Sequence, residues 1–148
     1  MPEPAANAGT SAYALSAAAR AFLDSPQRYG VLATINPDGT PHQAVVWYRL
    51  DDDDSVLINS RVGRRWPANL LRDPRCSLTA ESGLDYVVVR GTAAPSGEGD
   101  VAQRDIADLA VKYDGPEEAA RLVAVRFSAQ ERISFRIRIH GSYEHMEG

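Results

Sequence analysis

The residues of this 148-residue chain that are best suited to bind a charged ligand are gathered in segment 59–65. The segment joins a predicted strand to a predicted helix and combines arginines with a hydroxyl, an amide and a glycine: Asn59, Ser60, Arg61, Gly63, Arg64 and Arg65. Free backbone N–H groups and the positive end of the helix dipole favour an anion at a helix start. Arginine adds bidentate hydrogen bonds to phosphate. The spacing therefore predicts an anion site.

A second interpretation of the same segment is purely structural. In it, the arginines form a solvated basic face that pairs with Asp73 or with the acidic block Asp51–Asp54. Asn69, further along the predicted helix, also has two possible roles. It lines the anion site, or it bonds to the nearby backbone. The acidic block itself is predicted to be a solvated loop, because it lacks the glycine and the distal glutamate of a calcium-binding loop.

The second group of candidate residues lies on the predicted strand that follows the turn 36–39. Alternation along a strand places His42, Ala44, Val46 and Tyr48 on one face and Gln43, Val45, Trp47 and Arg49 on the other. A flat heterocyclic ligand binds to an apolar bed with a few fixed polar groups. Either face has that composition. For Trp47 the alternative is a place in the core or in a subunit interface.

Other kinds of site find little support in the sequence. There is no dinucleotide-binding motif, no P-loop and no nucleophile elbow. The three histidines lack metal-ligand spacing, so no metal site is predicted. Cys76, the single cysteine, is predicted to be a small buried side chain. A third group of candidate functional residues comes from later strands: Tyr86, Arg90 and Arg138. The alternative for each is a packing or surface role.

Short elements must position these candidates, because turn signals recur along the whole chain. Helices are predicted at 16–24, with Ser16 as N-cap, at 63–74 and at 101–112. Val87–Val89 predicts burial on both faces of its strand. Seven short strands with two or three short helices favour a mainly β, antiparallel barrel of the α+β class. The strands are predicted at 29–35, 40–50, 55–60, 75–81, 85–94, 122–127 and 133–139, with a loop at 95–100.

The overall composition restricts the class of protein. At 44% hydrophobic and 24% charged, it is typical of a globular protein, and no apolar run is long enough to span a membrane. The net charge of -4 and the sequence pI of about 5.3 disfavour nucleic-acid binding. The start of the chain does not resemble a secretory signal, so a cytoplasmic location is expected. Residues 1–14 are predicted to be a flexible tail and 15–148 a single domain.

Three stretches in this order resemble a known superfamily: YGVLATINPDGTPHQAVVWY, LINSRVGRRWPANLLRDPRCSLTAE and YVVVRGTA. Together they are similar to the flavin/deazaflavin oxidoreductases, the pyridoxamine 5′-phosphate oxidase-like split β-barrels, and most of all to the branch that uses the deazaflavin F420. The resemblance covers about residues 16–139. It implies an FMN-binding-like split barrel that forms a homodimer, with two cofactor sites at the subunit interface.

The resemblance also assigns roles to individual residues. The phosphate-bearing cofactor tail would lie along the basic segment and Asn69, which changes the preferred interpretation of that segment to a ligand site. The ring system would rest against the second strand, on His42, Gln43, Val45 and Val46. Trp47 and Tyr86 would contact substrate or the partner chain. Trp66 stands where many F420-binding members carry a lysine, and Arg65 beside it offers a replacement charge.

The resemblance thus predicts an F420-dependent reductase that transfers a hydride to a small conjugated molecule. No residue is a compelling nucleophile, which suits hydride transfer, and His42 is the one candidate for a proton-transfer role. Two alternatives remain: an FMN-dependent oxidoreductase of the same fold, and a non-catalytic F420-binding or storage protein. The C-terminal substrate-binding pattern of true pyridoxamine phosphate oxidases is not found. No nucleic-acid or membrane partner is expected.

Overall fold

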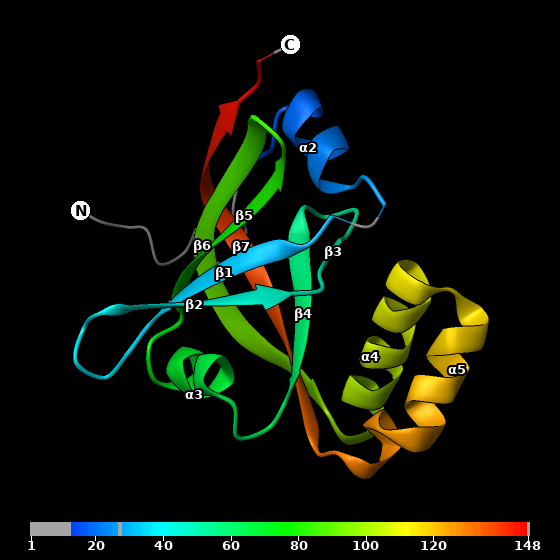
Figure 1. The fold of residues 1–148 in the computed structure, drawn as a ribbon. Coiled ribbons are helices and arrows are strands. Elements are labelled where there is room, and N and C mark those ends of the chain that lie inside the picture. Colours follow the sequence, from blue (N-terminus) through cyan, green and yellow to red (C-terminus); the bar gives the residue numbers. More distant parts are fainter. Residues whose placement is uncertain (1–12, 27, 148) are drawn as a thin grey trace.

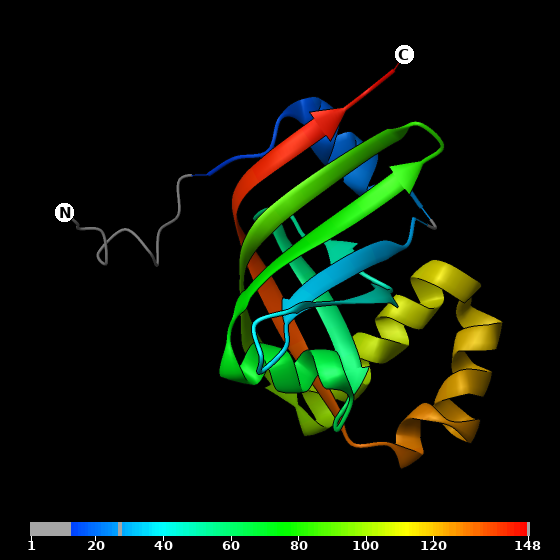
Figure 2. The same cartoon turned by 60° about the vertical axis from the view of Figure 1, so that its left-hand side comes forward.

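The computed structural model describes residues 13–26 and 28–147, and its centre is a curved antiparallel sheet. Seven strands in the described residues follow the order β2-β1-β5-β6-β7-β4-β3, and every pairing between neighbours is antiparallel. The strands are β1 (Gly30–Ile35), β2 (Pro41–Val46), β3 (Arg49–Leu50), β4 (Ser55–Arg61), β5 (Arg75–Ser82), β6 (Asp85–Glu98) and β7 (Arg132–His145). The sheet curls round its core, as Figures 1 and 2 show, which confirms the mainly β fold class.

Helices lie around the sheet and leave part of its outer face uncovered. They are α2 (Ala17–Leu23), α3 (Arg65–Arg72), α4 (Gly99–Asp114) and α5 (Pro116–Val125), with a 3₁₀ turn η1 (Phe127–Ala129). α4 and α5 form a hairpin on one side of the sheet, and α3 lies below β1 and β2 in Figure 1. None of the helices in the described part of the chain is long and apolar enough to cross a bilayer.

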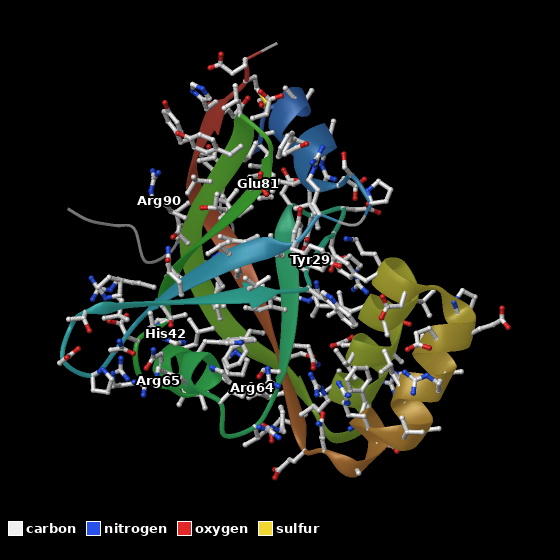
Figure 3. All side chains as sticks on the ribbon, viewed as in Figure 1. Tyr29, His42, Arg64, Arg65, Glu81 and Arg90 are labelled. Atoms are coloured by element: carbon white, nitrogen blue, oxygen red, sulfur yellow. The ribbon has the colours of Figure 1, made fainter. Side chains whose placement is uncertain are left out.

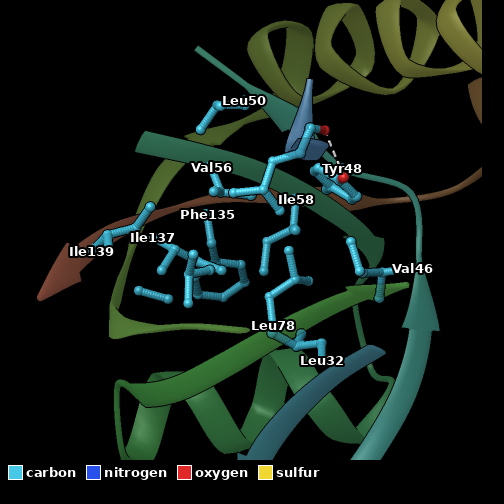
Figure 4. Close-up of a cluster of buried hydrophobic side chains, with 14 of the residues drawn as sticks. Leu32, Val46, Tyr48, Leu50, Val56, Ile58, Leu78, Phe135, Ile137 and Ile139 are labelled. Carbon is cyan, nitrogen blue, oxygen red and sulfur yellow. Dashed lines mark hydrogen bonds between the residues drawn. The ribbon is translucent and has the colours of Figure 1, made fainter. Parts of the chain in front are cut away.

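The main core lies inside the curved sheet, where alternate residues of each strand point inward. Ile133, Phe135, Ile137 and Ile139 of β7 are all buried, so the predicted alternation is confirmed. Tyr48 is completely buried, and its hydroxyl donates a 2.6 Å hydrogen bond to the Leu23 carbonyl oxygen, which ties α2 to the sheet (Figure 4). A buried phenol needs such a partner to offset its desolvation.

A second, smaller core lies between β4 and the helical hairpin. Leu57 faces outward on β4 and packs there with Ile106, Leu109, Leu122 and Phe127. Because one face of β4 meets the main core and the other meets the hairpin, the strand is buried on both faces from Val56 to Ser60. Asn59 shares the hairpin face with Leu57, since side chains alternate along a strand.

Several predicted elements are confirmed. The helix predicted at 16–24 forms, and its Ser16 hydroxyl accepts a hydrogen bond from the Ala19 backbone N–H, as an N-cap should. The hairpin around Asn36–Gly39 and the helix predicted at 63–74 also form. The predicted tail, 1–14, lies outside the described residues except for positions 13 and 14.

Other predictions about the elements are wrong. Residues 122–127 are not a strand: they end α5 and begin η1, because the apolar side chains Leu122 and Phe127 meet the face of α4. The predicted strand 40–50 is two strands, β2 and β3, broken at Trp47 and Tyr48. The predicted loop 95–100 instead continues β6 to Glu98. Val88 is only half-buried, so its strand is not buried on both faces.

Candidate functional site

A pocket of about 240 Å³ opens where β2, β4 and the start of α3 face the helical hairpin. We call it the arginine pocket. Its lining combines an apolar side with cationic and amide groups and includes no carboxylate: Val45, Val46, Trp47, Asn59, Ser60, Arg64, Trp66, Ile106, Arg126, Phe127, Gln130 and Arg132. A concave site with an apolar wall and a few convergent polar groups is typical of a small-molecule pocket.

Arg64 enters the arginine pocket from the start of α3. The turn before it depends on Gly63, whose φ of +101° is a left-handed conformation that a side chain would strain. Arg64 then occupies the N-cap position of α3, and its side chain makes no capping hydrogen bond. The first N–H groups of a helix have no partner within the helix and carry partial positive charge. The uncapped start of α3 and the Arg64 guanidinium therefore favour an anion together.

Arg132, at the start of β7, is held in place by two neighbours. Its Nε donates to the Asn59 side-chain oxygen at 2.8 Å, and its Nη1 donates to the Gln130 side-chain oxygen. Its guanidinium also lies over the Phe127 ring, with 4.9 Å to the ring centre. These contacts leave Nη2 available to a ligand, so the guanidinium is oriented before anything binds.

The electrostatics of Arg132 are those of a cation that lacks a counter-charge. Burial, together with the nearby charges of Arg64 and Arg61, lowers the pKa of Arg132 to about 10. The group therefore stays protonated at neutral pH. Crowding of three guanidiniums costs free energy in the free protein, and a bound anion would relieve that cost.

A buried polar network supports Arg132 from behind. Asn59 accepts from Arg132 and donates from Nδ2 to the Ala102 carbonyl oxygen at 3.0 Å and to Ser134 Oγ at 2.8 Å. Ser134 in turn donates to the Asp105 carboxylate at 2.7 Å. Both N–H donors and the oxygen of the Asn59 amide are therefore engaged. The structure places Asn59 at the pocket, but as the residue that orients Arg132.

Ser60, which also lines the pocket, has a hydroxyl that donates to the Arg61 carbonyl oxygen at 2.9 Å. Arg61 itself is exposed at the end of β4. Its charge reaches the pocket as one of the two that lower the pKa of Arg132.

Arg65 and Asn69 lie apart from this pocket, on the side of α3 that faces the β1–β2 turn. Asn69 is buried and donates to Thr34 Oγ1 at 3.0 Å and to Asn36 Oδ1 at 3.1 Å. Arg65 Nη1 makes a 3.5 Å contact with the same Asn36 oxygen. Figure 3 shows Arg64 and Arg65 on different sides of α3. The structure therefore joins Asn69 to the turn rather than to Arg64.

The predicted ring-binding residues of β2 divide between the two faces of that strand. His42 pairs with the buried Thr34, so it points inward, toward α3, as does the buried Val46. Gln43 and Val45 point outward and are exposed, with Val45 72% exposed. Gln43 and Val45 thus share a face that His42 does not.

The two predicted contacts for substrate or partner chain are far apart in the fold. Trp47 lines the arginine pocket and stacks on Tyr113 of α4, with 5.1 Å between ring centres and a 9° angle between planes. Tyr86 lies at the start of β6 and stacks on His145, 5.2 Å away. Trp47 is therefore placed at the site, and Tyr86 is not.

Among the described residues, the ion pairs that the structural interpretation predicted for the basic segment do not form, although Arg61, Arg64 and Arg65 are exposed, as that interpretation expected. Asp73 pairs with Arg75 at 2.8 Å. The acidic block is not simply solvated: Asp51 pairs with Arg49 and Arg136, and Asp54 pairs with Arg20. Within the described part of the chain, none of these three carboxylates forms an ion pair with Arg61, Arg64 or Arg65, and no other carboxylate does.

Three polar residues of the pocket were not predicted: Arg126, Gln130 and Arg132. Arg126 lies within the segment 122–127 that was wrongly predicted to be a strand, and it occupies the C-cap position of α5. Arg132 meets Asn59 across 73 positions of the chain. No local pattern in the sequence signals these contacts, because they depend on how the hairpin packs against β4.

Comparison with known proteins identifies the class. The family model described as pyridoxamine 5′-phosphate oxidase matches residues 15–141, and the chain belongs to that family. The fold is its split β-barrel, as predicted, and the family supports an oxidoreductase of the flavin type.

Solved structures with the same fold include the following three proteins. A conserved hypothetical protein of Mycobacterium tuberculosis is 28% identical, with 93% of this chain and 94% of that chain covered and a TM-score of 0.71. An F420 reductase is 22% identical, with 87% and 98% covered and a TM-score of 0.68. General stress protein 26 of Bacillus anthracis is 16% identical, with 85% and 89% covered and a TM-score of 0.61.

Proposed function

We propose that this protein is a cytoplasmic, homodimeric reductase that uses reduced F420 to reduce a small conjugated organic molecule. The observation that carries the proposal is the arginine pocket: oriented guanidiniums, with no carboxylate among them, at an uncapped helix start beside β2. When bound, the deazaflavin would supply a hydride. The protein would supply binding, orientation and shielding from water.

The residues of the pocket fit the acidic part of such a cofactor. Arg64, Arg126 and Arg132 would bind the phosphate and the carboxylates of the tail, each through charge-assisted hydrogen bonds. Three guanidiniums from separate elements exceed what one phosphate group requires, which favours a ligand with several negative charges. The shared fold of the F420 reductase supports the same choice.

The outer face of β2 would seat the ring system. Val45 offers an exposed apolar surface next to Trp47, and Gln43 follows on the same face. His42 points to the other side of the strand, so on this geometry it supports β2 rather than contacting the ring.

The exposed face is also the proposed dimer contact. Val31 and Val88 lie on outward positions of the neighbouring strands, close in register to Val45. We expect a second copy to cover the patch formed by Val31, Val45 and Val88 and to complete both cofactor sites. A stable monomer in sedimentation analysis would contradict this part of the proposal.

A titration with F420 tests the proposed function. Reduced and oxidised F420, followed by fluorescence, should bind the wild-type protein at micromolar concentration or below, and Arg64→Ala should weaken binding about tenfold or more. Arg104→Ala, on an exposed position of α4, is the matched control and should bind normally. Binding that is unaffected by Arg64→Ala would remove the arginine pocket from the proposal.

FMN is the second candidate cofactor, because Arg64 and Arg132 would also bind its phosphate and the family is that of pyridoxamine 5′-phosphate oxidase. A yellow protein with the absorbance of oxidised flavin would decide for FMN. Saturable F420 binding without turnover of any quinone, enone or tetrapyrrole acceptor would instead indicate a binding or storage protein.

A further inference from the structure

A second cavity lies on the outer face of the sheet, away from the arginine pocket. Its volume is about 460 Å³, within the range of roughly 300–1,000 Å³ that ligand pockets occupy. We call it the outer-face pocket. Strands β1, β2, β5, β6 and β7 line it with Ala33, Thr34, Ile35, Pro41, Arg75, Cys76, Ser77, Arg90, Gly91, Thr92 and His140. Most of the surface that the pocket exposes is apolar, and its lining contains no carboxylate.

Arg90 is the free cation of this pocket. Within the described residues it makes no ion pair or side-chain hydrogen bond, whereas Arg75 is already bound to Asp73 through two nitrogens. The Arg90 guanidinium lies against Gly141: a Cβ at that glycine would come within 2.4 Å of Arg90 Nη2. The glycine therefore allows the guanidinium to lie close to the sheet at the pocket.

Neighbouring groups make the same end of the pocket favourable to an anion. The His140 ring nitrogen Nε2 and Thr92 Oγ1 are 3.0 Å apart, so two polar groups are already fixed beside Arg90. Arg138, the register partner of Thr92, adds a further cation, and its Nε is buried with no hydrogen-bond partner. Opposite these groups, Ala33, Ile35 and Pro41 offer an apolar surface.

The outer-face pocket lies along the same face of β2 as the proposed cofactor seat. Pro41, at one end of β2, lines it, while Val45 at the other end lines the arginine pocket. Both residues point to the outer face of β2, with Gln43 between them. A ring seated on that face would lie between the two pockets, about 13 Å apart along the strand.

We propose that the outer-face pocket is the acceptor site, and that it binds a planar, conjugated molecule which carries a carboxylate. The carboxylate would pair with the Arg90 guanidinium, and the ring would lie on Ala33, Ile35 and Pro41. As an acceptor site this rests on the proposed reductase function; the binding of an aromatic carboxylate there does not.

The test uses 2-naphthoate and its neutral analogue 2-naphthamide as probes, with amide chemical shifts in NMR as the readout. Naphthoate should shift signals of residues around Arg90 and Thr92, and should bind at least about tenfold more tightly than the amide. Arg90→Ala should remove that preference, Arg90→Lys should keep part of it, and Arg104→Ala should leave it unchanged. Gly141→Ala, which moves the guanidinium but keeps its charge, should weaken naphthoate binding if the thermal melt shows a folded protein.

Three outcomes would overturn the proposal: equal binding of the two probes, a naphthoate affinity within twofold in Arg90→Ala, or shifts centred on Arg64. Displacement of naphthoate by saturating cofactor would also overturn it, because the pocket would then belong to the cofactor. Failure of the reductase function is separate. It would appear as naphthoate binding at Arg90 in a protein that binds neither F420 nor FMN.

Discussion

Two clusters of arginines in this fold differ in one respect, the presence of a carboxylate. In the paired cluster, Asp51 lies between Arg49 and Arg136 and forms an ion pair with each. In the open cluster, Arg64 and Arg132 face the arginine pocket with Arg61 nearby, and no carboxylate lines that pocket. Both clusters contain a residue from β7, and the side chains of both are half-buried or exposed.

The difference supports a structural role for the paired cluster and the proposed binding role for the open cluster. In the paired cluster the charges are neutralised within the protein, so nothing is left for a ligand. In the open cluster the same residue type is held by neutral groups, Asn59 and Gln130, which orient a guanidinium without cancelling its charge. A bound anion would offset the electrostatic cost of the crowded cations in the open cluster.

The largest expected effect comes from removing the open cluster. Arg64→Ala combined with Arg132→Ala should weaken cofactor binding by about 100-fold or more, since each guanidinium makes charge-assisted hydrogen bonds worth about 1.5–3 kcal/mol. Fluorescence titration measures the affinity. A thermal melt checks that the variant is folded, because Arg132→Ala also leaves the buried Asn59 oxygen without this partner. An affinity that stays within a few-fold of wild type would place the cofactor elsewhere.

Removing the carboxylate of the paired cluster should affect stability instead. Asp51→Asn removes the carboxylate that Arg49 and Arg136 share and leaves Arg49 with a 4.0 Å pair to the exposed Asp108. We expect a loss of about 1–2 kcal/mol in the free energy of unfolding. Urea denaturation measures it, and Asp52→Asn, at an exposed neighbouring position, is the control. Cofactor affinity should not change; a large loss of binding would mean that the clusters are not separate.

A carboxylate placed in the open cluster should convert it into the paired kind. Gln130→Glu keeps the size of the side chain and presents a charged oxygen to Arg132, which should weaken cofactor binding by about five- to tenfold while stability is kept or raised. Gln130→Ala removes the contact without adding charge and should have a smaller effect. Equal affinities for the two variants would show that neutralisation is not the cause.

The smallest effect is a difference in acid sensitivity. Burial opposes ionisation of Asp51, but hydrogen bonds and charges from Arg49 and Arg136 outweigh it and lower the pKa of its carboxyl. A carboxyl whose pKa is lowered in the native state stabilises the fold at pH values above about 4, the pKa of an aspartate in the unfolded chain. This contribution to stability is lost as the pH falls through the native pKa. Unfolding between pH 7 and 2 should therefore depend less on pH in Asp51→Asn, whereas Asp52→Asn should follow wild type.

The sequence predicted those parts of the fold that depend on local patterns. Turn residues marked the β1–β2 hairpin, Ser16 marked the start of α2, and alternation along β7 marked its buried face. Local patterns failed at α5, where Leu122 and Phe127 suit a strand or a helix equally, and packing against α4 decides for the helix. The count of seven strands agreed only because one predicted strand became a helix while another became two.

The candidate site divides in the same way. Arg64 and Gly63 follow from the sequence, because a glycine turn before a helix is local chemistry. Tertiary structure alone decided that Arg65 and Asn69 lie on the other side of α3. It also decided that Arg126 and Arg132 join Arg64. Residues far apart in the chain come together only when β4 and β7 pair and the hairpin packs on them. The sequence sets which charges the protein carries; packing determines which of them are neutralised and which stay open to a ligand.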